Sequence, residues 1–188
     1  MKKIYIVTTF TGTLLSCLIR NISKTPYAHV SIALNEYLRP MYSFGRLNPK
    51  TPIFAGFVEE NINEGLYAIR TNTMCRVYSL MVTERQYEKL KENIDNVSIN
   101  RKQYVYDVKA LVYLSVNKHR KKDYKYVCSH FVADMLKRSE INILDKEPHQ
   151  VRPNDFYDLC DLELEYEGLL SNYYEKDKVH NIGDVVKI

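Results

Sequence analysis

The stretch YKYVCSHFVADMLKR, Tyr124–Arg138, decides the fold, because it places a cysteine where a helix begins. The spacing of apolar residues after Cys128 is that of one helical face: Phe131, Val132, Met135 and Leu136. A thiol in the first turn lies among unpaired backbone N–H groups at the positive end of the helix dipole, and both favour the thiolate. The stretch therefore predicts a helix that begins with a nucleophilic cysteine. The alternative is a small apolar residue at the start of a core helix.

The composition is that of an ordinary globular protein, with 45% hydrophobic and 27% charged residues. A chain of 188 residues is long enough for one hydrophobic core, so we expect a single domain over residues 1–188. The cysteines show no paired spacing, which predicts neither a zinc site nor a disulfide framework, and we expect no metal or cofactor. Free thiols fit a reducing, cytoplasmic compartment. They are Cys17, Cys75, Cys128 and Cys160.

The charge pattern argues against a nucleic-acid partner. The formal net charge is only +4, and the basic cluster Lys118–Lys122 is typical of a solvated loop. No segment approaches the apolar length of a membrane span, so we expect no stable insertion into a bilayer. Nothing in the sequence predicts an oligomeric state.

The N-terminus allows two interpretations. Lys2 and Lys3 followed by an apolar run that ends at residues 14–17 (LLSC) resemble a signal peptide with a lipoprotein-type cleavage site. The other interpretation is a strand over Lys3–Thr9, a turn at Gly12 and a helix capped by Thr13. We favour the second, because threonines and a glycine interrupt the apolar run.

The remaining periodicities predict an α+β fold. Alternating or β-branched stretches predict further strands at Tyr27–Leu34, Met41–Phe44, Cys75–Met81 and Leu162–Glu167. Helices are predicted from a Thr83–Gln86 capping box through Asn93, over Asp107–Val116, and as a short turn at Pro153–Asn154. Residues 45–65 are rich in Asn, Pro and Gly and are interpreted as a long loop over a site, and a polar tail is expected from about residue 172.

Five histidines compete as the base for Cys128, and His29 is the best candidate. It belongs to an apolar strand and lies on the same side as the small residues Ser31 and Ala33. His130 is two residues beyond Cys128, roughly 200° around the helix, so it faces elsewhere. The alternative for His29 is a hydrogen-bonded core histidine. The other three histidines lie in loops or in the polar tail: His119, His149 and His180.

The order of these motifs resembles the circularly permuted branch of the NlpC/P60 superfamily of papain-like cysteine hydrolases. The strand histidine in YAHVSIAL, the next strand MYSFGR and the cysteine of YVCSHFVADML follow one another as in that branch, and lecithin retinol acyltransferase-like enzymes share the order. Residues 152–156 (RPNDF) resemble the downstream Pro-x-Asp turn. The resemblance runs from Lys3 to about Leu159, and it implies a central antiparallel sheet with the cysteine helix packed on one face.

Transferred position by position, the resemblance implies that Cys128 is the nucleophile and His29 the general base. The orienting residue on the following strand corresponds to Ser43, with Tyr42 or Glu36 as substitutes. A serine departs from the carboxylate, amide or imidazole usual there, and a poor orienting residue costs turnover more than it costs the fold.

The implied reaction is thiol-dependent hydrolysis of amide bonds in peptides or amino-acid conjugates, through an acyl-enzyme. Tyr42, Arg46 and Arg152 are candidate substrate-binding residues, the arginines for a substrate carboxylate. Two alternatives stay open: a lipid-directed thiol acyltransferase or esterase, and a non-catalytic binding module on the same scaffold.

Overall fold

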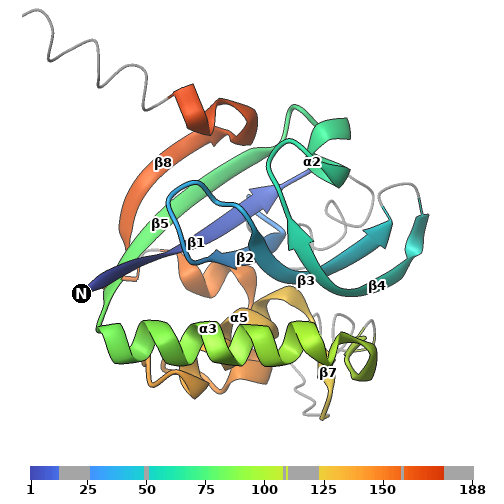
Figure 1. Ribbon diagram of the computed structural model, residues 1–188. Helices are drawn as coiled ribbons and strands as arrows, with labels where there is room; N and C mark the ends of the chain where they lie inside the picture. Colours follow the sequence, from blue (N-terminus) through green and yellow to red (C-terminus); the bar gives the residue numbers. More distant parts are fainter. Residues whose placement is uncertain (13–25, 49–50, 108, 110–122, 158, 176–188) are drawn as a thin grey trace, which may run out of the picture.

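The computed structural model describes residues 1–12, 26–48, 51–107, 109, 123–157 and 159–175, and a six-stranded antiparallel sheet forms its centre (Figure 1). The strand order is β4-β3-β2-β1-β5-β8. The strands are β1 (Lys2–Phe10), β2 (His29–Ala33), β3 (Met41–Asn48), β4 (Thr51–Glu60), β5 (Met74–Val82) and β8 (Glu163–Leu169). A separate two-stranded parallel sheet pairs β6 (Val105–Tyr106) with β7 (Lys125–Tyr126). Together with the helices, this arrangement is an α+β fold.

Two helices, α3 (Glu84–Ile99) and α5 (Cys128–Arg138), lie side by side against one face of the sheet (Figure 1). The shorter helices are α2 (Gly65–Ile69), η1 (Arg101–Gln103), η2 (Pro148–Gln150), η3 (Pro153–Phe156) and η4 (Leu170–Glu175). The helix α5 packs against β2 and β3, and this contact brings its first residue to the beginning of β2. In the described part of the chain, no helix has the length and apolar character needed to cross a membrane.

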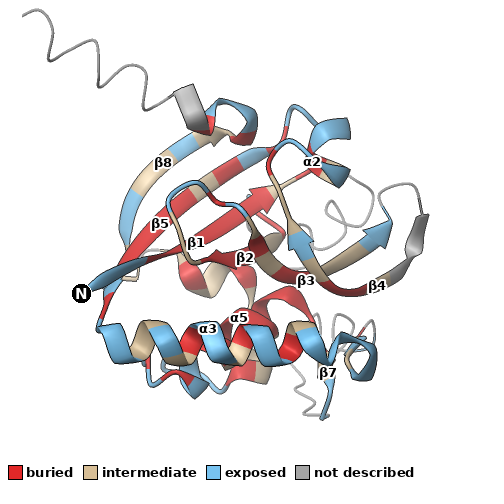
Figure 2. Cartoon of the chain, in the orientation of Figure 1, coloured by how far each residue is buried: buried red, intermediate tan, exposed pale blue. Residues whose placement is uncertain are grey.

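The core has two layers, one on each face of the sheet (Figure 2). Alternate residues of β1 show the division: Ile4 and Ile6 join the layer under α3 and α5, whereas Tyr5 and Val7 join the opposite layer. Phe131 of α5 lies at the centre of the first layer and is fully buried. Its ring centroid is 5.3 Å from that of Phe44. The cysteine helix is therefore fixed to the sheet by aromatic packing.

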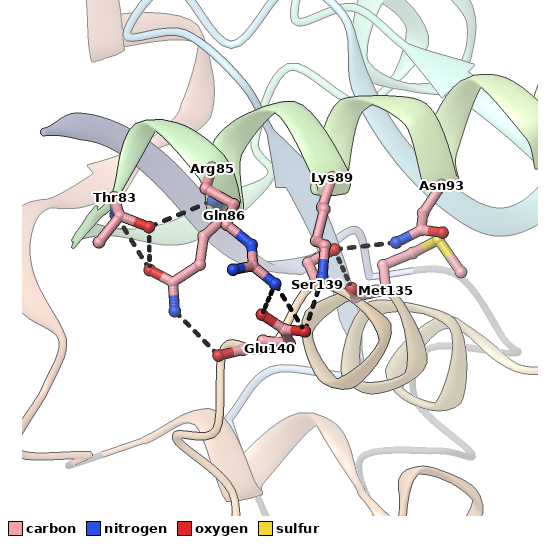
Figure 3. A network of polar contacts seen from close by, with 8 residues as sticks. All are labelled: Thr83, Arg85, Gln86, Lys89, Asn93, Met135, Ser139 and Glu140. Atoms are coloured by element: carbon pink, nitrogen blue, oxygen red, sulfur yellow. Dashed lines mark hydrogen bonds and ion pairs between the residues drawn. The ribbon is translucent and has the colours of Figure 1, made fainter.

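Polar contacts join the C-terminal end of α5 to α3 (Figure 3). The carboxylate of Glu140 accepts from Lys89 at 2.6 Å and pairs with Arg85 at 3.3 Å. The Asn93 amide donates to Ser139 Oγ at 3.1 Å, and Ser139 is fully buried. These contacts lie at the opposite end of α5 from Cys128, so they hold the helix axis without touching the thiol.

Most of the predicted elements are confirmed. The five predicted strands correspond to β1, β2, β3, β5 and β8, and the predicted cysteine helix is α5, with Cys128 as its first residue. The Thr83–Gln86 capping box is present and opens α3, which continues beyond the predicted end at Asn93 to Ile99. The turn at Pro153–Asn154 is the 3₁₀ helix η3.

The long loop predicted over residues 45–65 is wrong. β3 continues to Asn48, and β4 occupies Thr51–Glu60, so most of the stretch is a hairpin. Gly45 pairs with Gly56 across it. Glycine and proline weaken an isolated strand, but here pairing within a sheet overrides that preference.

Some predictions lie outside the described residues. They include the helix capped by Thr13, most of Asp107–Val116 and the last part of the polar tail. The beginning of that tail, from residue 172, belongs to η4, in which Tyr173 is buried.

Candidate functional site

Cys128 is held by the N-terminus of α5. The N-cap residue Val127 has no side chain that accepts from the helix N–H groups, and no side-chain cap is present there among the described residues. Ser129 anchors the turn instead, because its hydroxyl donates to the Val151 carbonyl at 2.6 Å. The first N–H groups of α5 have no partner within the helix and remain available to an anionic group beside the sulfur.

His29 is the first residue of β2, and its ring is paired with the carboxylate of Glu60 at the end of β4. His29 Nε2 lies 3.1 Å from Glu60 Oε1 and 3.2 Å from Oε2. The two side chains are 20% and 16% exposed, so the pair is largely withdrawn from water. With Nε2 directed at Glu60, Nδ1 is the nitrogen left for the thiol.

Cys128 acts on the His29 ring, because its hydrogen bonding and its charge both raise the pKa of His29. Burial lowers the pKa of His29, but the charge of Glu60 and the hydrogen bonds with Cys128 and Glu60 outweigh burial and hold that pKa well above 6.5. The structure therefore brings together two side chains that are about a hundred positions apart in the sequence, as the sequence hypothesis requires.

A polar cluster surrounds the Glu60 carboxylate. Ser31 donates to Oε2 at 2.6 Å, and the buried Tyr67 hydroxyl donates to the same oxygen at 3.4 Å. The Tyr67 hydroxyl in turn lies 3.3 Å from Thr9 Oγ1. Burial alone would raise the pKa of Glu60, but His29, Ser31 and Tyr67 together lower it below its usual 4.5. Glu60 is therefore held as a carboxylate.

Gly45 leaves room for the imidazole. A Cβ placed on Gly45 would lie 3.5 Å from His29 Cε1 and 3.6 Å from Glu60 Oε1. Such a methyl group is still at van der Waals distance, whereas a larger side chain would compete with the ring for space. The absence of a side chain here is thus a property of the site and not only of the strand.

The assignment of the orienting role to Ser43 is corrected by this geometry. The Ser43 hydroxyl is fully buried and donates to the Val30 carbonyl at 2.7 Å, while Glu60 holds the imidazole. Tyr42 and Glu36, the alternatives to Ser43, do not orient the imidazole either. Tyr42 stacks on Phe57 with ring centroids 6.3 Å apart, and Glu36 is exposed in the turn after β2, at the opposite end of that strand from His29.

Glu60 is the candidate site residue that sequence reasoning missed, because it lies in the stretch interpreted as a loop. The turn sequence Asn48-Pro49-Lys50, between two stretches with aromatic residues, was the available signal for a hairpin. Extending the pairing from that turn would have placed Glu60 on the strand beside β3.

The two arginines predicted to bind a substrate carboxylate, Arg46 and Arg152, lie in different parts of the structure. Arg46 lines a cavity of about 380 Å³, together with Arg101, Glu60 and Tyr67. Burial and the charge of Cys128 raise the pKa of Tyr106, and Arg46 lowers it, so both charged groups act at this tyrosine. Arg152 lies at the N-cap of η3, next to the Val151 carbonyl that anchors α5, and its backbone N–H donates to Asp155.

Cys128 and His29 differ in their exposure to solvent. Cys128 is 4% exposed, whereas the side chain of His29 keeps 20% of its surface. The other described cysteines are Cys75, which is buried, and Cys160, which is exposed. Burial and the charge of Glu167 raise the pKa of Cys75 to about 12, which makes that thiol a poor nucleophile.

His130 faces away from His29, as its position on the helix predicts. Its ring packs on Tyr126 with centroids 4.5 Å apart, and His149 lies 6.4 Å beyond. Within the described ranges, no group of three or more histidine, cysteine or acidic side chains is arranged to hold a metal ion.

The sequence matches no known protein-family model, and no curated protein is significantly similar to it. The function must therefore be argued from the site itself.

Proposed function

We propose that the protein is a thiol-dependent acyl hydrolase in which Cys128, His29 and Glu60 form the catalytic triad. The observation that carries the proposal is the His29–Glu60 pair, 3.1 Å apart, on a ring whose pKa Cys128 raises from the start of α5, the helix that packs against β2. A nucleophile, a base and a group that orients the base are the three parts that nucleophilic catalysis requires.

The mechanism follows from these positions. His29 takes the proton of Cys128, and the sulfur attacks the carbonyl carbon of the substrate to form a tetrahedral intermediate. The backbone N–H of Cys128 donates to the oxyanion, a contribution of about 3 kcal/mol in enzymes where such a donor has been removed. The His29 imidazolium then returns the proton to the leaving amine, and a thioester with Cys128 remains. Water, deprotonated by His29, releases the acyl group and restores the thiol.

Glu60 sustains this cycle by electrostatics. Its carboxylate fixes the ring through Nε2 and stabilises the imidazolium that forms when the sulfur loses its proton. Ser31 and Tyr67 supply donors that keep the carboxylate in place. They are positioning residues, since they act through Glu60.

The order of the elements supports a permuted NlpC/P60-like arrangement within this proposal. The base lies on β2 and precedes the nucleophile at the start of α5, while the antiparallel sheet packs against that helix. Glu60 supplies the orienting group that Ser43 would have supplied poorly, so the departure from the family pattern is smaller than the sequence suggests.

The surroundings favour a polar substrate. The cavity beside Glu60 is lined by two arginines, Arg46 and Arg101, and by glutamates that include Glu59 and Glu64, with apolar residues between them. Opposite charges on one lining suit a substrate that carries both a carboxylate and an ammonium group, such as a peptide or an amino-acid conjugate. A simple acyl chain offers no partner for these charges, so the lining favours the amide substrate over the lipid one.

Turnover of activated acyl substrates tests the proposal. γ-Glutamyl p-nitroanilide, which keeps a free α-carboxylate, and p-nitrophenyl acyl esters are incubated with the protein, and the intact mass is recorded. We expect release of the chromophore and an acyl adduct on Cys128, both absent in Cys128→Ala. Cys160→Ala is the matched control and should keep full activity.

A binding module is the second candidate, and the 4% exposure of Cys128 favours it. A sealed thiol would react with neither substrate nor a small electrophile such as iodoacetamide. The absence of both iodoacetamide labelling at Cys128 and turnover, in a protein shown to be folded, would point to the binding module.

A further inference from the structure

A second pocket, independent of the triad, lies on the side of α5 that carries His130. Its volume is about 390 Å³. Its described lining consists of Tyr104, Asp123, Tyr124, Tyr126, His130, Asp134 and Arg138. Three tyrosines and two carboxylates against a single guanidinium make an aromatic and acidic lining. None of these residues takes part in the mechanism proposed above.

Among the described residues of the lining, the one guanidinium or ammonium group is already paired. Arg138 contacts Asp134 Oδ2 at 2.8 Å and donates to the Tyr126 hydroxyl at 3.1 Å. The same Tyr126 hydroxyl donates to Asp134. Asp134 and Arg138 therefore neutralise each other on one wall of the pocket.

With Asp134 and Arg138 paired, Asp123 is the remaining charged group of the described lining. It is exposed at the rim and has no ion-pair partner among the residues that the structure describes. His130 adds no positive charge to compensate it, because burial lowers the pKa of His130 to about 4, although Asp134 opposes the shift. The described side chains of the lining therefore carry a net negative charge near neutral pH.

The tyrosine side of the pocket includes a residue with an unfavourable backbone conformation. Tyr124 has φ +58°, a left-handed conformation that is unfavourable for a bulky residue, and the residue is 56% exposed. Tyr104 packs edge-on against it at 5.5 Å and lies 5.8 Å from Tyr126. A strained backbone that presents a largely exposed ring at the rim of a pocket has the character of a binding feature.

From this pocket of tyrosine rings and an unpaired carboxylate, we propose that the protein binds a small alkylammonium compound between Tyr124, Tyr104 and Asp123. Tyrosine faces attract weakly hydrated organic cations, and the Asp123 carboxylate adds Coulombic attraction at the rim. The inference does not depend on the catalytic function of Cys128.

A titration with choline tests the proposal, with 3,3-dimethylbutan-1-ol as its uncharged isostere. The protein carries ¹³C-labelled tyrosine, and the ring signal of Tyr124 is assigned by its loss in Tyr124→Leu. We expect choline, but not the alcohol, to shift the signals of Tyr124 and Tyr104 in a saturable manner. Sodium chloride at equal ionic strength should have no such effect.

Variants locate the site. Asp123→Asn and Tyr124→Leu should each weaken choline binding by roughly three- to fivefold, the size of one exposed cation–π or ionic contact. Tyr37→Leu and Asp145→Asn change residues of similar exposure elsewhere and should leave binding unchanged. Both pocket residues are exposed, so folding is retained, which circular dichroism verifies. Equal shifts with the alcohol, unchanged binding in both pocket variants, or no shift up to about 100 mM choline would overturn the proposal.

Discussion

At the scale of single residues, the proposed function depends on the Glu60 carboxylate, which pairs with the His29 ring. Replacing Glu60 with glutamine keeps the shape of the side chain and removes its charge. We expect the pKa of His29 to fall in Glu60→Gln, because the ion pair that opposes burial is lost. The imidazole proton signals, followed by NMR against pH, measure that pKa. Turnover should drop by roughly 100-fold or more, since a glutamine stabilises the imidazolium poorly.

Ser43→Ala is the control for this experiment. Its hydroxyl serves the Val30 carbonyl, so its loss should leave the titration of His29 unchanged. A His29 pKa that moves with Ser43 and not with Glu60 would return the orienting role to the serine.

The ion pair between Glu60 and His29 also predicts how the stability of the protein depends on pH. The pKa of Glu60 is lowered from 4.5, so its contribution is present above that pH and is lost as pH falls through the folded-state value. The pKa of His29 is raised from 6.5, so its contribution is present below 6.5 and is lost as pH rises through the folded-state value. The stability difference between wild type and Glu60→Gln should therefore be largest between pH 4.5 and 6.5 and shrink on both sides. Urea unfolding across that range measures it, and a difference that does not vary with pH would contradict the ion pair.

The places of Cys128 and His29 in the fold could be predicted from the sequence, whereas the pairing of Glu60 with His29 could not. Cys128 is marked by the helical spacing behind it, and His29 by its apolar strand. These are local patterns in which one segment determines the structure. Glu60 reaches His29 only through the register of β3 on β4, which is a long-range property.

At the scale of elements, substitutions of Gly45 and Gly56, which pair in the β3–β4 hairpin, can test stability and turnover separately. Gly45→Val should favour the strand but place methyl groups against the His29 ring, because even a Cβ there lies 3.5 Å from Cε1. We expect unchanged or higher thermal stability together with a loss of turnover of roughly 10-fold or more, the usual consequence of a displaced base.

Gly56→Val is the matched control on the paired strand. A Cβ on Gly56 would meet the exposed Leu47 side chain at 3.5 Å and not the triad. Both variants are assayed for melting temperature and for turnover. Equal turnover in the two would show that Gly45 gives the imidazole no special room.

The same hairpin explains where the fold prediction failed. Local composition predicts a loop wherever Asn, Pro and Gly gather, and residues 45–65 contain all three. Strands β1 and β5 were recognised because their β-branched and aromatic residues are buried on both faces. β3 and β4 are instead a pair whose glycines meet, and only the sheet as a whole favours that arrangement.

At the scale of the whole molecule, one aromatic group joins the sheet to the cysteine helix. The ring of Phe131 packs against Phe44 at 5.3 Å and Phe57 at 5.7 Å, and it is fully buried. Phe131→Ala should lower the free energy of unfolding by about 3–5 kcal/mol, through lost burial and a residual cavity. Urea unfolding measures the loss. Ile99→Ala, at the end of α3 where the residue is 79% exposed, should change the free energy by no more than about 0.5 kcal/mol.

The most direct test of the central claim is the rate at which iodoacetamide alkylates each cysteine near neutral pH, read by peptide mass spectrometry. We predict that Cys128 reacts faster than the exposed Cys160, that His29→Gln slows Cys128 by roughly 10-fold or more, and that His130→Gln leaves it unchanged. Cys128 that reacts no faster than Cys160, or at the same rate with and without the His29 imidazole, would contradict the triad.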